Sequence, residues 1–164
     1  MRAMPNRWKP NVTVAALIER DGHFLLVEED TADGLRLNTP AGHLDPGESP
    51  IQACVREVLE ETAYDFTPEA LVGVYLNRFT RTRTGSDITY LRFAFAGSIG
   101  THHGWRGLDD GIIRTVWMTF DEIKTQGERL RSPLVVRSIE DYLAGQRAPI
   151  DLIHTDPSVL QRAN

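Results

Sequence analysis

The stretch "PAGHLDPGESPIQACVREVLEETAY", residues 40–64, decides the fold of this chain, because a loop of glycine and proline runs directly into a well-specified helix. Ser49 and Gln52 stand at the spacing of a capping box, and Pro50 suits the first helical position. We therefore predict a helix that begins at Pro50. Near its end this helix becomes strongly acidic, in the segment "REVLEET" at residues 56–62.

Three carboxylates gather on one side of this helix. At about 100° per residue, Glu57, Glu60 and Glu61 fall within an arc of about 100°, and we predict that they point away from the apolar face that packs on a sheet. A solvated polar face is the simpler interpretation. However, a like-charge i,i+4 pair costs a few tenths of a kcal/mol, and the helix dipole disfavours acids in the last turns. A bound divalent cation would reverse both effects.

The kind of cation follows from the donors. The single cysteine, Cys54, lies inside the helix and is interpreted as a packing residue, and no Cys or His ligand pattern for zinc accompanies the acids. Carboxylate and carbonyl oxygens suit Mg²⁺ or Mn²⁺. Because Mg²⁺ often completes its shell with substrate phosphates, the cluster indicates a phosphorylated substrate.

The remaining elements predict one layered α/β or α+β domain with a mixed sheet. The Asp21–Gly22 pair predicts a hairpin, and the segment 30–42 is predicted to be loop. Ser132 and Pro133 predict the start of a last helix that ends near Gly145. Apolar, β-branched runs predict strands at residues 12–19, 23–29, 71–79, 88–99 and 112–117.

Composition narrows the class of protein. The 164 residues fit one domain, with an expected N-terminal extension at residues 1–10, a core domain at 11–147 and a C-terminal tail at 148–164. The net charge of −5 argues against a stable nucleic-acid partner. No segment has the length and apolarity of a signal peptide or a membrane span. With one cysteine, we expect a cytoplasmic protein.

The spacing of the charged residues resembles the Nudix box, the signature of the Nudix hydrolase family. Its pattern, Gly-x5-Glu-x7-Arg-Glu-apolar-x-Glu-Glu-x-Gly-apolar, is matched at Gly42, at Glu48 and at residues 56–61. The last pair departs from it, because Ala63 and Tyr64 replace glycine and an apolar residue. Glycine just past a helix often takes a left-handed backbone. Ala63 therefore predicts either a cost of roughly 1 kcal/mol or a different cap.

The resemblance implies an α/β/α sandwich with a mixed sheet and a metal-dependent hydrolase site. Arg56 is implied to orient a carboxylate, Glu57 or Glu61 to act as the base, and Glu48 to support the loop or the helix start. The reaction implied is metal-assisted attack of water on a phosphoanhydride. The ligands of Mg²⁺, or of Mn²⁺, are implied to be Gly42, through its carbonyl, and Glu57, Glu60 and Glu61.

Stretches outside the box, among them "FLLVEE", "PAGHL" and "LRSPLVVRSIEDYLAGQRAP", are similar to the NudJ branch of bacterial Nudix phosphatases. This branch implies a monomer acting on nucleoside di- and triphosphates, or on thiamine-pathway pyrophosphates. Leu37 stands where that branch carries tryptophan, which could shift the preference. Two alternatives stay open: a pyrophosphatase for nucleotide sugars or dinucleoside polyphosphates, and a non-catalytic sensor that binds nucleotides or RNA.

Several residues outside the box are candidates for substrate contacts. Arg92, within a strand, is the preferred phosphate-binding arginine, ahead of exposed arginines such as Arg78, and His43 is the second candidate substrate contact. Trp105 could stack on a base. The loop acids at 109–110 could serve as base or distal ligand, although solvated loop acids are more common.

Overall fold

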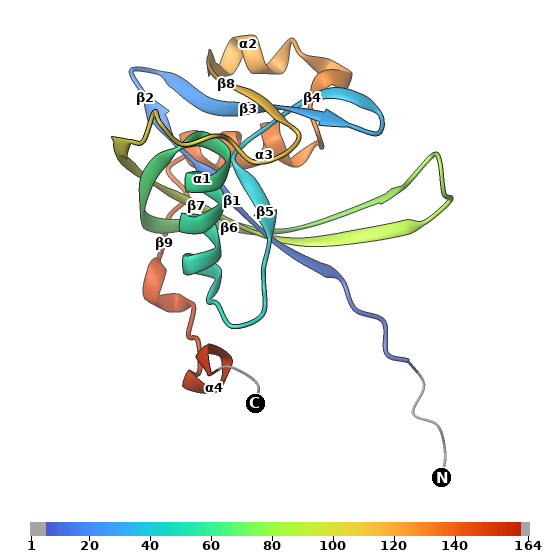
Figure 1. Cartoon of the computed structure of the whole chain (residues 1–164), viewed down its shortest axis with the longest axis vertical. Helices are drawn as coiled ribbons and strands as arrows, with labels where there is room; N and C mark the ends of the chain where they lie inside the picture. Colours follow the sequence, from blue (N-terminus) through green and yellow to red (C-terminus); the bar gives the residue numbers. More distant parts are fainter. Residues whose placement is uncertain (1–5, 162–164) are drawn as a thin grey trace.

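The computed structural model describes residues 6–161, and Figure 1 shows two sheets with helices packed around them. Residues 1–5 of the expected N-terminal extension and 162–164 of the expected tail lie outside the described residues. The strands are β1 (Asn11–Leu17), β2 (Glu19–Arg20), β3 (His23–Thr31), β4 (Gly34–Asn38), β5 (Ala41–His43), β6 (Tyr64–Thr80), β7 (Asp87–His102), β8 (Ile112–Thr119) and β9 (Ala148–Pro149). The helices are α1 (Pro50–Thr62), α2 (Phe120–Lys124), α3 (Leu134–Leu143) and α4 (Pro157–Leu160), with 3₁₀ turns η1 (Gly127–Arg129) and η2 (Ile150–Leu152).

The predicted mixed pairing is confirmed. The larger sheet has the strand order β5-β1-β7-β6-β9, in which β1 and β7 are parallel and the other neighbours are antiparallel. The smaller sheet joins β2, β3, β4 and β8. Because side chains alternate between the two faces of a strand, the larger sheet presents one apolar face to α1 and another to α3.

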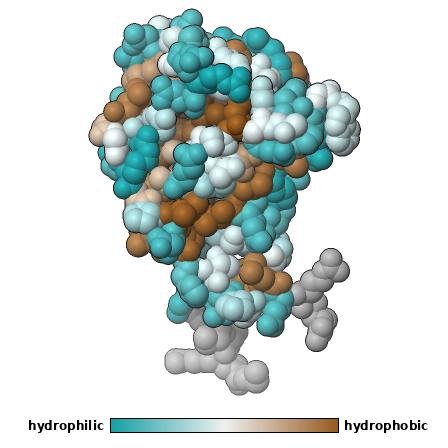
Figure 2. All heavy atoms as spheres, turned by 90° about the vertical axis from the view of Figure 1, so that its left-hand side faces the viewer, coloured by the Kyte–Doolittle hydropathy of each residue, from teal (hydrophilic) through white to brown (hydrophobic). Residues whose placement is uncertain are grey.

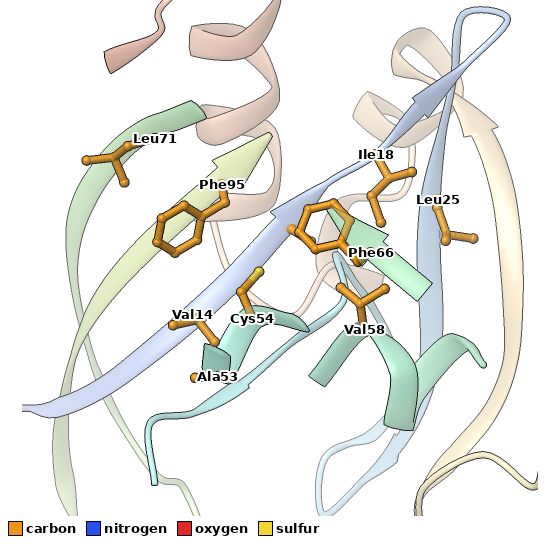
Figure 3. Close-up of a cluster of buried hydrophobic side chains, with 10 residues drawn as sticks. Val14, Ile18, Leu25, Ala53, Cys54, Val58, Phe66, Leu71 and Phe95 are labelled. Atoms are coloured by element: carbon orange, nitrogen blue, oxygen red, sulfur yellow. The ribbon is translucent and has the colours of Figure 1, made fainter. Parts of the chain in front are cut away.

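Two buried clusters fill these two interfaces. On the α1 side, Val14 and Phe95 of the sheet pack with Ala53, Cys54 and Val58 of the helix, as Figure 3 shows. On the opposite side, a second cluster holds Leu17, Val72 and Ala96 of the sheet with Val135 and Ile139 of α3. The α/β/α layering implied by the family resemblance is therefore the arrangement of the chain.

One predicted loop contains strands. The segment 30–42, expected to be loop, instead forms the end of β3, all of β4 and the start of β5. A two-residue turn at 32–33 joins β3 to β4, with Gly34 at φ +94°. This segment has a strong turn signal, but β4 is too short for its alternation to stand out. The strand matters because it carries Asn38 to the candidate site, while Leu37 packs in the second buried cluster.

The start and end of the helix α3 can be compared with the helix predicted after Ser132. Ser132 accepts a hydrogen bond on its hydroxyl from the backbone N–H of Leu134 (3.2 Å), where α3 begins, one residue after the expected Pro133. Gly145 follows α3 with φ +83°, as expected of a helix stop. Farther on, β9 pairs with β6, and residues 150 and 153 pack against the α1 cluster.

Figure 2 shows a hydrophobic band crossing an otherwise mostly hydrophilic face of the molecule.

A long hairpin leaves the body of the molecule. Strands β6 and β7 continue as a two-stranded arm, which Figure 1 shows extending away from the helices. We call residues 74–92 the hairpin arm. Their pairing runs without a register shift, from Val74 opposite Phe93 to Thr80 opposite Asp87. Within the described residues, no helix has both the length and the apolarity that a membrane crossing requires.

Candidate active site

The start of α1 is as predicted. The Ser49 hydroxyl accepts from the backbone N–H of Gln52 (3.1 Å), and the Gln52 side chain accepts in return from the N–H of Ser49 (2.8 Å). Pro50 opens the helix at the position where a missing N–H costs nothing. This reciprocal cap fixes the first turn, and therefore the rotation of every acid that follows.

The end of α1 keeps the geometry of the missing glycine. Ala63 has φ 60° and ψ 15°, a left-handed conformation, and its N–H donates to the carbonyl of Leu59 (2.9 Å). The loop 103–111 covers this end: the N–H of His103 donates to the carbonyl of Ala63 (2.8 Å), and the N–H of Asp109 to that of Glu60 (2.9 Å). The same loop therefore caps the helix and brings an acid to its carboxylates.

The predicted orientation of the acids is wrong for two of them. Glu57 and Glu61 are 8% and 6% exposed, on the same buried face of α1 as Cys54 and Val58. The helical wheel placed the centre of the buried face too far from the acids, because it considered only packing on the sheet and not the strand β5 that lies beside α1. Burying two neighbouring carboxylates is costly, and within the described chain only Glu57 of the two is paired with a basic side chain, Arg56. Their burial therefore strengthens the prediction of a cation site.

Arg56 joins most of the box residues. Its Nε and Nη2 atoms donate to the two carboxylate oxygens of Glu48 (3.0 and 2.7 Å), which is a bidentate pair. Nη1 donates to Glu57 (2.8 Å) and to Glu60 (3.1 Å), and Nη2 also donates to the carbonyl of His43 (2.9 Å). One guanidinium therefore connects the end of β5, Glu48 in the loop that follows it, and two acids of α1.

The loop approaches the acids closely. The backbone N–H of Ala41 donates to Oε2 of Glu61 (3.0 Å). A Cβ atom on Gly42 would overlap with the carboxyl group of Glu57. Glycine is required at this position by space rather than by backbone conformation, since its φ is not positive.

The electrostatics of the acids fit a cation. Burial raises the pKa of Glu61 to about 9; the hydrogen bond from Ala41 opposes this, and Glu29, Glu57 and Asp109 add to it by like-charge repulsion. Burial also raises the pKa of Glu57, against the effect of Arg56. Carboxyl groups that repel one another in a site lined by oxygen donors suit a hard divalent ion. Within residues 6–161, no three acidic, His or Cys side chains converge in ligating positions.

A cavity of about 710 Å³ opens beside Glu61. Its floor includes Arg92, which is only 7% exposed and whose Nε and Nη1 atoms have no hydrogen-bond partner among the described residues. Burial lowers the pKa of Arg92, while Glu29 and Glu61 oppose this. A buried guanidinium whose donors lack partners leaves an unmet need for hydrogen-bond acceptors, and this one lies beside two acids in the wall of the cavity.

Comparisons with known proteins identify the family of the chain. The NUDIX domain family matches residues 8–137. The chain belongs to the Nudix family. Phosphatase NudJ of Escherichia coli strain K12 is 37% identical over 147 residues, which cover 89% of this chain and 92% of that protein.

Solved structures of Nudix proteins share the fold. A NUDIX hydrolase from Nitrosomonas europaea is 51% identical, with a TM-score of 0.82, covering 90% of this chain and 98% of that one. A UDP-X diphosphatase is 20% identical with a TM-score of 0.67, covering 87% of this chain and 67% of that one, and shows similarity of fold. This chain is accordingly a Nudix hydrolase, and the alternative of a non-catalytic sensor has no better support.

Most of the other residues predicted to contact the substrate line the cavity, but Trp105 does not. Arg92 and His43 line the cavity, as do Arg78 and both loop acids, Asp109 and Asp110. Arg78 is also paired with Asp87 at the surface. Trp105 is 83% exposed and lies outside the cavity lining, so its predicted role in stacking has no structural support. Cys54 is buried and burial raises the pKa of its thiol, as expected of a packing residue.

Sequence reasoning missed several residues that line the cavity. They are Thr13, Glu29, Asn38 and Arg131. Thr13 stands opposite Arg92 in the parallel pair of β1 and β7, and opposite His43 in the antiparallel pair of β1 and β5. Oxygen atoms of Thr13 and Asn38 are buried without hydrogen-bond partners among the described residues. No local signal marks these residues, because strand register brings them together.

Proposed function

We propose that this Nudix hydrolase is a Mg²⁺-dependent phosphatase of nucleoside di- and triphosphates, with Mn²⁺ as an alternative metal. The observation that supports it best is Arg92, a nearly buried arginine with two unpaired nitrogens that lines the same cavity as Glu61. A phosphate group would add acceptor oxygens for the unpaired donors of this guanidinium. The identity shared with Phosphatase NudJ supports a phosphatase activity.

The residues of the box would divide the work. Glu57, Glu60, Glu61 and the carbonyl of Gly42 would hold the metal, which supplies a Lewis acid for the phosphoryl oxygens and lowers the pKa of a bound water. Arg56 keeps Glu57 and Glu60 aimed from one side through its fork. Glu48 in turn fixes Arg56 and the loop, since its Oε1 also accepts from the backbone N–H of Asp45 (2.8 Å).

Two acids are candidates for the proton acceptor. Burial and repulsion raise the pKa of Glu61 in the absence of metal, so its carboxylate becomes available once a cation compensates its charge. Asp109 is near enough to raise the pKa of both Glu57 and Glu61, and it lies on the cavity wall. We propose one of these two as the base, with Arg92 binding the phosphate that the water attacks. We further propose a cytoplasmic monomer.

The decisive experiment compares Glu60→Gln with the wild type. Glu60 is the least costly ligand to change, because its partly exposed side chain contacts Arg56 and little else. Residues that merely support metal ligands cost about 10–100-fold when changed, so we expect phosphate release to fall by more than about 100-fold. Glu140→Gln, an exposed acid on α3, is the matched control.

The substrates should cover nucleoside di- and triphosphates, thiamine pyrophosphate, a nucleotide sugar and a dinucleoside polyphosphate, each with Mg²⁺ and with Mn²⁺. Undiminished release by a folded Glu60→Gln would refute the metal assignment. Preference for the nucleotide sugar or the dinucleoside compound would replace the proposed substrate class.

A further inference from the structure

Three aromatic rings follow one another along the cavity. The ring centroids of His43 and Tyr90 are 5.8 Å apart, at an interplanar angle of 65°. Those of Tyr90 and Phe79 are 5.6 Å apart, at 35°. All three residues line the cavity. We call them the aromatic row; it runs from the box loop at His43 to the hairpin arm at Phe79.

Strand register places this row on the same face as the phosphate-binding arginine. Tyr90 stands opposite Asn77, and the next outward position of β6 on that face is Phe79. Arg92 lies two residues from Tyr90 on β7, a separation of roughly 7 Å along the strand. The row therefore continues outward from the place where Arg92 would bind a phosphate.

Packing of the protein does not account for these rings. Neither of the two buried clusters that hold the sheet to its helices includes Tyr90 or Phe79. Both rings are only half-buried, and His43 is exposed. The arm that carries two of them extends away from the body of the molecule, as Figure 1 shows. All three side chains line the cavity and keep part of their surface accessible to a ligand there.

We propose that the aromatic row is the stacking platform for the ring of the substrate, with Tyr90 and Phe79 as its main residues. This inference rests on the proposed function and deepens it: the phosphates lie at Arg92 and the box acids, and a nucleobase or similar flat heterocycle lies over the arm. Stacking uses the faces of rings and not their edges, so it tolerates different bases. The platform accordingly selects substrates that carry an aromatic ring, with little preference among bases.

The test uses leucine, which keeps apolar volume but removes the ring. Tyr90→Leu and Phe79→Leu should each lower kcat/KM for a nucleoside triphosphate by about 5- to 100-fold, the range for losing one stacked base. Turnover of 5-phosphoribosyl pyrophosphate, which has no aromatic ring, should change by less than about twofold. Tyr90→Phe should recover what Tyr90→Leu loses. Leu76→Ala is the matched control, since Leu76 is 67% exposed on the opposite face of the same strand.

Binding provides a second measurement that does not depend on turnover. Calorimetric titration with a nucleoside monophosphate should show the same loss in the leucine variants, while titration with ribose 5-phosphate should not. Equal losses on ring-bearing and ring-free ligands, or no loss on either, would overturn the stacking platform. If the proposed function is wrong, the wild type would hydrolyse none of the phosphoanhydrides. The binding comparison between ring-bearing and ring-free ligands would still test the stacking platform in that case.

Discussion

Replacing Gly42 by alanine tests how the box loop controls the metal site. The backbone of Gly42 does not need glycine, since its φ is not positive. The added methyl group would instead occupy the space of the Glu57 carboxyl group. Glu57 is a flexible side chain at its far end, so the protein can fold if that carboxylate moves aside.

The size of the effect follows from this displacement. Non-bonded carbon atoms rest about 3.5–4.0 Å apart, so the carboxyl group has to move by more than about 1 Å. A misplacement of about 1 Å in a catalytic constellation costs about 100-fold. We therefore expect kcat/KM to fall by about 100-fold, equivalent to about 2.7 kcal/mol in the barrier. The stability should fall by only about 1–3 kcal/mol, as for other overpacked sites.

The assay pairs steady-state kinetics with direct metal binding. Mn²⁺ titration followed by electron paramagnetic resonance would report the affinity, and thermal unfolding would report stability. Gly107→Ala is the matched control: no heavy atom lies within 4 Å of the place that its added methyl group would take, and its φ is also not positive. If Gly42→Ala kept wild-type metal affinity and turnover, Glu57 would not be a ligand held by this close approach.

Three further changes have defined outcomes. Arg56→Lys removes the bidentate pair with Glu48 and should lower metal affinity or turnover by about 10–100-fold. The control is Arg137→Lys, which changes an exposed ion pair on α3 and should have almost no effect in the same assays. Ala63→Gly should raise the free energy of unfolding by about 0.5–1 kcal/mol, because relief of left-handed strain exceeds the chain entropy that glycine adds. Calorimetry should then show Tm rising by about 1–4 °C. A lower Tm would contradict the presence of strain at Ala63. Burial raises the pKa of Glu61 to about 9 in the folded chain, so metal-free protein holds a proton there that the unfolded chain has released; its stability should decline as pH rises from about 4.5 to 9. Mg²⁺ displaces that proton, so the increase in Tm on adding Mg²⁺ should be larger near pH 8.5 than near pH 6.5; a Mg²⁺ effect independent of pH would contradict it.

Much of the fold was predictable because its signals are local. The cap at Ser49 and Pro50 and the stop at Gly145 depend on residues within one turn of each helix end, and both are confirmed. Apolar β-branched runs identified the long strands. The short strand β4 was missed, since five residues give too little alternation to distinguish a strand from the turn beside it.

The site also has a part that local sequence predicted and a part that it did not. The spacing of Gly42, Glu48 and residues 56–61 identified the box and the hydrolase family, and it predicts a Mg²⁺ or Mn²⁺ site. The sequence could not show that Glu57 and Glu61 are buried, because their burial depends on β5 lying beside α1.

Only the tertiary structure decided what surrounds the box. Residues far apart in the chain, such as Thr13, Tyr90 and Arg92, share one cavity because β1 and β7 pair in parallel and strand register sets which side chains face the same way. The sequence by itself therefore determined the residues and spacing of the Nudix box, which lies on one helix and the loop before it. The other residues of the cavity lie on separate strands, so their proximity depends on how those strands are paired.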